Sequence, residues 1–167
     1  TTTVTLVAGR LGDRRPPSPP PSSWAARPDT AVAIWTLRLD PGARWVLPAA
    51  DPAAHRSLYF FRGSELRVGG HAVPSRHLAE LRPDVSAELE NGPDEAEALL
   101  LQGRPIGEPV AKGGPFVMNT SAEIREAFAD YQSTGFGGWP WTSDDPVHPR
   151  EAGRFARLID GRTERPT

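Results

Sequence analysis

The sequence contains no cysteine, only one lysine, and no apolar run long enough to span a lipid bilayer. The lack of cysteine excludes a disulfide framework and any metal site built from thiolates. Charge of one sign is also lacking, because 21 acidic side chains nearly balance 19 basic ones and leave a formal net charge of -2. Such a balance gives no field that would concentrate nucleic acid or anionic lipid. We therefore expect neither as a partner, and a cytoplasmic protein is the default expectation.

Proline and glycine, in contrast, are abundant, with 19 and 16 residues respectively in a chain of 167. So many prolines disfavour a helical bundle, because each one removes a backbone donor and fixes φ. Short runs of alternating or continuous apolar residues recur instead, each closed by a turn residue, which predicts an antiparallel sandwich or barrel. The predicted strands cover residues 3–8, 31–39, 44–48, 57–61, 65–68, 77–81, 85–89 and 96–101.

The segment 13–23 is rich in proline and cannot join a sheet. A polyproline ligand for an SH3-type domain is one interpretation of this segment. Composition favours the other interpretation, which is an extended loop exposed to solvent.

One stretch, residues 120–134, is typical of an amphipathic helix. Thr120 and Glu123 have the spacing of a capping box, in which each side chain accepts from the other residue's backbone N–H. Four apolar residues then recur at helical spacing on one face, namely Ile124, Ala127, Phe128 and Tyr131. A helix this short needs a surface to cover that face, so we expect the face to dock on a partner. The following tail, residues 135–167, is either packed through Trp139 and Trp141 or disordered, and two tryptophans so close together favour packing.

An ordered string of residues near this helix resembles the C-terminal signature of the pirin family. Its core is Gly114, Pro115, Phe116, Asn119 and Thr120, preceded by Leu99-Leu100-Leu101 and Gly103-Arg104-Pro105-Ile106 and followed by Glu123-Ile124. Residues 40–43 and 58–63 resemble the second barrel of that family more weakly. The resemblance implies a mainly β fold: a cupin-type antiparallel barrel, or jelly roll, over residues 1–119, with one C-terminal helix.

Pirins have two cupin barrels, and the resemblance implies that this chain is the second one. In the family the first barrel holds iron or another divalent metal through three His and one Glu, and the second is usually free of metal. The stretch after Gly42, residues 44–50, lacks the family's His-x-His pair, so no metal ligand is expected in this chain. A metal is expected only in an N-terminal cupin outside it.

No catalytic residue is predicted, because no Gly-x-Ser-x-Gly turn occurs and the histidines are scattered. His55 is the most interesting of the four, since it lies with Tyr59 near the expected barrel mouth and could contact a ligand. The other three, His71, His77 and His148, are better explained as turn or surface residues.

Three functions follow from the resemblance as expectations. The chain is a non-catalytic module that completes a bicupin fold or binds a partner. Alternatively, it is part of a quercetin 2,3-dioxygenase-like enzyme whose metal lies in the N-terminal cupin. A third possibility is a protein-binding module of the transcription-cofactor type. The expected partners are an N-terminal cupin, another protein chain, or a second copy that docks through the helix.

Overall fold

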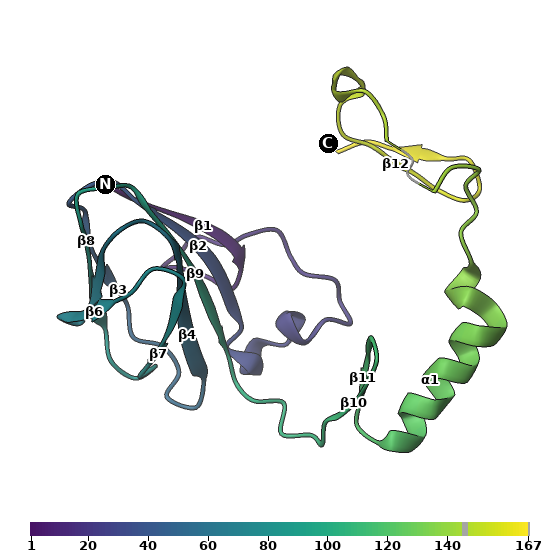
Figure 1. Ribbon diagram of the computed structural model, residues 1–167, viewed down its shortest axis with the longest axis horizontal. Coiled ribbons are helices and arrows are strands. Elements are labelled where there is room, and N and C mark those ends of the chain that lie inside the picture. Colours follow the sequence, from purple (N-terminus) through teal and green to yellow (C-terminus); the bar gives the residue numbers. More distant parts are fainter. Residues whose placement is uncertain (145–146, 167) are drawn as a thin grey trace. The chain divides into compact units, whose positions relative to one another are not determined.

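The computed structural model describes residues 1–144 and 147–166 (Figure 1). Contacts divide the chain into two compact units, Thr1–Ile106 and Gly107–Thr167. We call them the barrel unit and the helical unit and describe each by itself. Within the described residues no helix has both the length and the apolar character required to cross a lipid bilayer.

The barrel unit consists of two antiparallel sheets that enclose one apolar core (Figure 1). This arrangement confirms the predicted mainly β fold. The first sheet has the order β1-β2-β9-β4-β7, so that β9 lies between strands from the first half of the unit. Its strands are β1 (Thr2–Ala8), β2 (Ala33–Leu39), β9 (Ala96–Gly103), β4 (His55–Arg62) and β7 (His77–Leu81). The second sheet contains β3 (Arg44–Leu47), β8 (Ala87–Asn91), β5 (Leu66–Val68) and β6 (His71–Val73).

Strand alternation builds the core in rows across the first sheet. One row consists of Trp35, Leu100 and Leu58, which are cross-strand partners on β2, β9 and β4. The next row contains Leu37, Ala98 and Phe60 in the same order. All six are buried, because successive residues of a strand point to opposite faces and these occupy the inner one.

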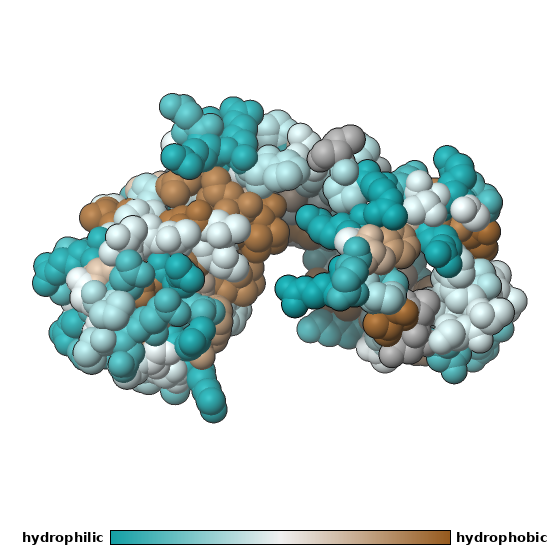
Figure 2. All heavy atoms as spheres, turned by 90° about the horizontal axis from the view of Figure 1, so that it is seen from above, coloured by the Kyte–Doolittle hydropathy of each residue, from teal (hydrophilic) through white to brown (hydrophobic). Residues whose placement is uncertain are grey.

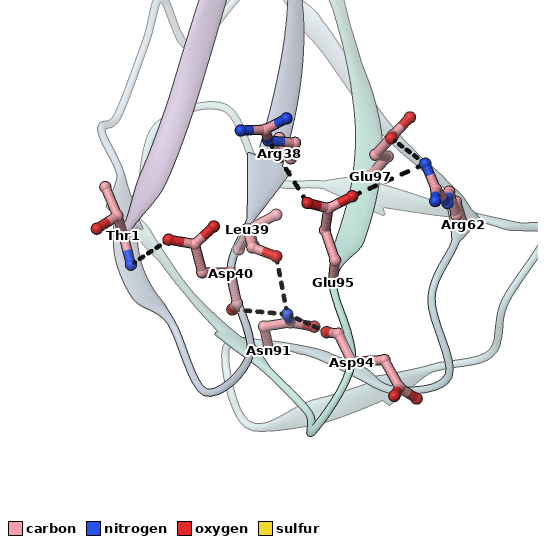
Figure 3. Close-up of polar contacts among 9 residues, drawn as sticks. All are labelled: Thr1, Arg38, Leu39, Asp40, Arg62, Asn91, Asp94, Glu95 and Glu97. Carbon is pink, nitrogen blue, oxygen red and sulfur yellow. Dashed lines mark hydrogen bonds and ion pairs between the residues drawn. The ribbon is translucent and has the colours of Figure 1, made fainter.

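The Asn91 side chain forms a set of hydrogen bonds at one end of the barrel unit (Figure 3). Its side-chain amide donates to the backbone oxygens of Leu39, Asp40 and Asp94 at 2.7–3.0 Å. These oxygens belong to the end of β2 and to the turn before β9, so one side chain satisfies acceptors from two connections. Beside it, the Arg62 guanidinium contacts the carboxylates of Glu97 at 2.7 Å and Glu95 at 3.8 Å.

The structure adds strands that the sequence pattern does not predict. A β-hairpin of β10 (Ala111–Gly113) and β11 (Phe116–Met118) replaces part of the expected irregular connection after residue 101. The short strand β6 was not predicted, and β8 begins at Ala87 where the pattern suggested residue 85. Three-residue strands such as these carry too few alternating positions to be recognised.

The helix α1 (Ser121–Thr134) packs on the β10–β11 hairpin within the helical unit. Phe116 of β11 is the centre of this contact, with its ring centroid 4.9 Å from Phe128 and 6.3 Å from Tyr131, both in edge-to-face geometry. A Cβ placed on Gly113 would lie 2.5 Å from the Ile124 Cγ2 atom, so the hairpin backbone approaches the helix too closely for any side chain there. This close approach explains why position 113 is a glycine.

The predicted capping box is present at the start of α1. Thr120 Oγ1 accepts from the Glu123 amide at 3.2 Å, and Glu123 Oε2 accepts from the Thr120 amide at 2.7 Å. Asn119 strengthens the start of the helix, since its backbone N–H donates to the same carboxylate and its side chain donates to Glu108. Most of the family-like signature thus encodes a hairpin turn and a helix cap.

The C-terminal tail is not uniformly packed. A two-residue pairing joins β12 (Ala156–Arg157) to β13 (Thr163–Glu164). The Trp139 side chain is 55% exposed and donates from Nε1 to the Ser143 oxygen, whereas Trp141 is partly buried beside His148 and Phe155. Residues 145 and 146 lie outside the described part of the chain.

Replacing Asn91 by alanine is expected to lower the free energy of unfolding of the barrel unit by about 1–3 kcal/mol, because partly buried carbonyl oxygens lose their donor. Asn91→Asp should cost at least as much, since it places an acceptor against three acceptors. Chemical denaturation measures both. Arg44→Ala, which removes only exposed ion pairs with Glu88 and Glu90, serves as the control and should cost under about 1 kcal/mol. Equal small effects from all three would contradict the assigned role of Asn91.

Gly113→Ala is expected to displace α1 from its hairpin, because the new methyl group would overlap Ile124. Hydrogen exchange of the α1 backbone amides should then be faster, by about tenfold for each 1.4 kcal/mol lost. Val117→Ala, at a side chain of β11 that is 61% exposed, is the matched control and should leave exchange nearly unchanged. Unaltered protection in Gly113→Ala would show that the helix does not depend on this contact.

Candidate functional site

The last inner row of the first sheet is polar, unlike the apolar rows beside it. Arg56 of β4 and Gln102 of β9 are cross-strand partners in this row, and Ala33 of β2 continues it. The Arg56 side chain belongs to a residue only 3% exposed, although arginine is rarely buried without a partner. This row lies at one end of the barrel unit, and we call that end the mouth.

A chain of hydrogen bonds links the mouth residues to two flanking segments. Arg56 Nε donates to Gln102 Oε1 at 2.8 Å, and Gln102 Nε2 donates to the backbone oxygen of Ala31 at 2.9 Å. Arg56 Nη1 donates to the backbone oxygen of Pro48 at 2.7 Å. The guanidinium therefore contacts only neutral acceptors. Burial lowers the pKa of Arg56 from its usual range. The side chain nevertheless keeps its charge at neutral pH.

The backbone before β2 is shaped to serve this network. Ala31 has φ of 52°, a left-handed conformation that costs a non-glycine residue about 1 kcal/mol or more. Buried Thr30 precedes it; its backbone oxygen accepts from the Arg104 amide at 2.7 Å, and its hydroxyl donates to the Arg27 oxygen. These bonds hold the turn that directs the Ala31 carbonyl toward Gln102.

A salt bridge lies beside the network at the same end of the barrel. Arg104 Nε donates to Asp51 Oδ2 at 3.0 Å, and Nη2 contacts the same oxygen. The hydrogen bond from Arg104, followed by that from the Ala53 amide, lowers the pKa of the Asp51 carboxyl below its ordinary value. Asp51 is therefore ionised at neutral pH and already engaged.

The Arg56–Gln102 network and Asp51, but not Arg104, line a hollow of about 820 Å³ that is open to solvent on one side, which we call the mouth hollow. Its floor includes Arg56, Gln102 and the buried ring of Trp35, and the Pro-rich segment supplies part of its wall through residues 15–19. The Pro-rich segment therefore borders the mouth. The volume lies within the range of small-molecule sites.

The side chains at the mouth are not suited to coordinate a metal cation. A divalent ion requires imidazole, carboxylate or similar lone pairs, whereas the charged side chain of the inner row is a guanidinium that repels cations. The stretch that lacks the family's His-x-His pair, as predicted from the sequence, turns Trp45 and Leu47 of β3 toward the core. Across residues 1–144 and 147–166, no three His, Asp or Glu side chains are grouped as metal ligands.

The predicted ligand contacts lie on the opposite face of β4 from Arg56. His55 and Tyr59 alternate with the inward Arg56 and Leu58, and both are exposed. Neither lines the mouth hollow, so their contact with a ligand stays a prediction. His71 and His77 are exposed as well, and the His148 ring stacks at 4.3 Å from Phe155.

The predicted docking face of the helix is partly covered by its own hairpin. Ala127 is buried and Ile124 half-buried, whereas Phe128 and Tyr131 remain 37% and 54% exposed. The sequence does not predict this cover, because the three-residue strands of β10–β11 give no periodic signal. Docking of a partner on the remaining exposed surface stays a prediction.

Sequence reasoning also missed Arg56 and Gln102. A signal for Arg56 exists in residues 56–60, where its position is in phase with Leu58 and Phe60 and therefore points inward. An arginine in phase with the apolar positions of a predicted strand is unusual enough to be singled out.

Comparison with known proteins agrees with the architecture. Residues 34–137 match the family model described as the pirin C-terminal cupin domain. The chain is 33% identical over 132 residues to a Pseudomonas aeruginosa protein whose name presents it as a candidate quercetin 2,3-dioxygenase, covering 77% of this chain and 44% of that protein. It is 42% identical over 132 residues to a pirin-like protein of Solanum lycopersicum, covering 77% and 42% respectively. Human pirin is 32% identical over 113 residues, covering 65% and 38%.

A crystal structure of quercetin 2,3-dioxygenase from Acinetobacter baumannii shares the fold, with a TM-score of 0.68 and 24% identity. The alignment covers 82% of this chain and 44% of that one. The chain thus spans less than half the length of these relatives. The family match covers more than half of the chain and includes most strands of both sheets, the hairpin and the helix. The chain therefore belongs to the pirin family, as a C-terminal cupin domain.

Proposed function

We propose that this chain is the non-catalytic half of a bicupin protein and docks on an N-terminal cupin through the outer face of its five-stranded sheet. The observation that carries the proposal is the apolar character of that face. Solvent-facing strand positions are usually polar in a sheet with one solvated face, so an apolar outer row indicates a surface that another layer covers.

The outer face carries large apolar side chains in two neighbouring rows, which also contain the polar Thr36, Ser57 and Glu80. Tyr59 of β4 pairs with Leu78 of β7 and with Leu99 of β9, which places the three side chains in one outward row. The next row contains Ile34 and Leu101 together with the polar Ser57 and Glu80. Tyr59 is 39% and Leu78 is 45% exposed. In the space-filling view, apolar side chains gather on the surface of this unit, at the left of Figure 2.

Charged residues border one end of this apolar face. Arg38, Glu97 and Arg62 form the next outward row, and Arg38 contacts Glu95 at 3.7 Å (Figure 3). An apolar centre with a polar, hydrogen-bonded rim is the usual arrangement of a protein interface. Burial of the centre would contribute about 25 cal/mol for each Å² of apolar surface removed from water.

The exposed rings of the helical unit offer a second contact for the same partner. Tyr131 and Phe136 lie 5.2 Å apart and are 54% and 60% exposed. Aromatic side chains are enriched in interfaces because they bury a large area at low cost in conformational entropy. A second copy of this chain is the alternative occupant of this contact.

An enzymatic role remains the second candidate, favoured by the names of the relatives. Under it, the whole protein resembles a quercetin 2,3-dioxygenase, and iron or another divalent metal is bound by the N-terminal cupin. This chain would then contribute stability and part of the wall but no ligand. A protein-binding role of the transcription-cofactor type would use the same apolar face.

Leu78→Arg is expected to break the contact between the two halves in a chimera, because it places a charge in the outward row that contains Tyr59 and Leu99. The chimera joins this chain to the N-terminal half of the Solanum lycopersicum relative. The unmodified chimera should unfold in one cooperative transition, and Leu78→Arg should separate it into two by differential scanning calorimetry. Val46→Arg, at a side chain 55% exposed on the other sheet, is the matched control and should keep one transition. Identical behaviour of the two variants would refute this docking face.

The purified chain by itself is expected to retain less than about 0.1 equivalent of iron, nickel, manganese or zinc after dialysis, because the barrel interior offers apolar side chains and a guanidinium. The chimera should retain about one equivalent. Elemental analysis by mass spectrometry measures both. A stoichiometric metal in the isolated chain would contradict the division of roles between the two halves.

A further inference from the structure

The mouth hollow has more hydrogen-bond donors than acceptors. Arginine has five N–H groups, and the described structure accounts for one on Nε and one on Nη1 of Arg56. The remaining three have no acceptor among the described residues. The Nε1–H of Trp35, in the adjacent inner row, is buried and also lacks an acceptor there. The buried Trp35 N–H without an acceptor is costly, and the Arg56 Nη2 group also lacks a protein acceptor although it is not fully buried, so a binding partner rich in acceptors suits this end of the barrel.

The charged side chains that line the mouth hollow also favour a ligand rich in acceptors. No carboxylate of the described residues forms an ion pair with Arg56, which is therefore a desolvated cation without a counter-ion. Arg10, Arg15 and Arg27 also line the mouth hollow, and Asp51 lines it but is engaged by Arg104. Arg27 is paired with Asp29, which leaves Arg10 and Arg15 as exposed cations at the rim. The hollow consequently carries a positive potential in a chain whose formal net charge is -2.

The N–H groups of Arg56 that remain free indicate which class of anion the hollow can bind. With Nε and one Nη1 hydrogen occupied, the other Nη1 hydrogen and both hydrogens of Nη2 have no protein acceptor among the described residues. Two parallel N–H groups match the two oxygens of a carboxylate, which accepts them as a bidentate pair. Trp35, Val32 and Pro48 supply apolar walls for the body of such a ligand.

We infer that the mouth hollow is a binding site for a small organic carboxylate, with Arg56 as the group that binds the carboxylate and Arg10 and Arg15 as the rim that attracts it. Gln102 is a positioning residue, because it fixes the guanidinium through Nε and is itself fixed by the Ala31 carbonyl. This site is independent of the proposed docking face, since Arg56 and Tyr59 lie on opposite faces of β4.

Benzoate is the probe, with benzamide as its neutral counterpart and inorganic phosphate as an anion of different shape. Titration calorimetry of the whole chain at low salt should detect saturable binding of benzoate at least about tenfold tighter than that of benzamide or phosphate. Tenfold corresponds to about 1.4 kcal/mol, a modest value for a charge-assisted pair. The Nε–H signal of the Arg56 side chain should shift with the same affinity in proton–nitrogen NMR spectra.

Two kinds of variant separate binding from folding. Arg56→Met should abolish saturable binding, but it leaves Gln102 and Pro48 without a donor and could unfold the mouth. The double variant Arg10→Glu and Arg15→Glu changes only exposed side chains, and it should weaken benzoate binding by about fivefold or more, with a smaller loss at high salt. The charge-matched control is Arg67→Glu with Arg125→Glu, two exposed arginines that do not line the hollow.

The inference is overturned if benzoate shows no saturable binding, or if benzamide binds as tightly. It is also overturned if phosphate binds as tightly, because charge alone would then explain the result. If a folded Arg56→Met variant still binds benzoate, the ligand lies at another place and the inference is overturned as well. Preferential benzoate binding that is weakened by the rim variant and not by the control supports the site.

Discussion

The structure depends on one constraint: every second side chain of β2, β9 and β4 points into a core from which water is excluded. Along most of these strands the constraint is met by apolar rows such as Trp35-Leu100-Leu58. At the mouth the same alternation directs Arg56 and Gln102 inward. A charge is tolerated there because backbone carbonyls and the Gln102 amide are within reach, and because the hollow opens beyond it. The two faces of one sheet thus provide two surfaces of different chemistry.

This separation is compatible with the proposed roles of the two barrels. A barrel that carries a guanidinium in its inner row is poorly suited to a metal ion, and one that carries Tyr59, Leu78 and Leu99 on its outer face is suited to contact another layer. The bulky Trp45 and Leu47 on β3 fill the core where ligands could otherwise converge.

Much of the fold could be predicted from residues alone, and the failures have physical causes. The strands around Leu37, Leu58 and Leu100 were identifiable because long runs repeat the alternation several times, and Thr120 with Glu123 identified the helix start. The β10–β11 hairpin was missed, since three residues on each side of Gly114-Pro115 give no periodic signal. The mouth was missed for a different reason: the partners Arg56, Gln102 and Ala31 are far apart in sequence, and only the sheet register brings them together.

The strand order has a consequence for the newly made chain. β9 occupies the middle of the five-stranded sheet, between β2 and β4, yet it is the last strand of that sheet to be synthesised. Until residue 103 has left the ribosome, both neighbours keep a long backbone edge with unsatisfied donors and acceptors. Such edges invite pairing with other nascent chains. The chain is therefore most vulnerable to aggregation during translation, in the interval before its central strand arrives.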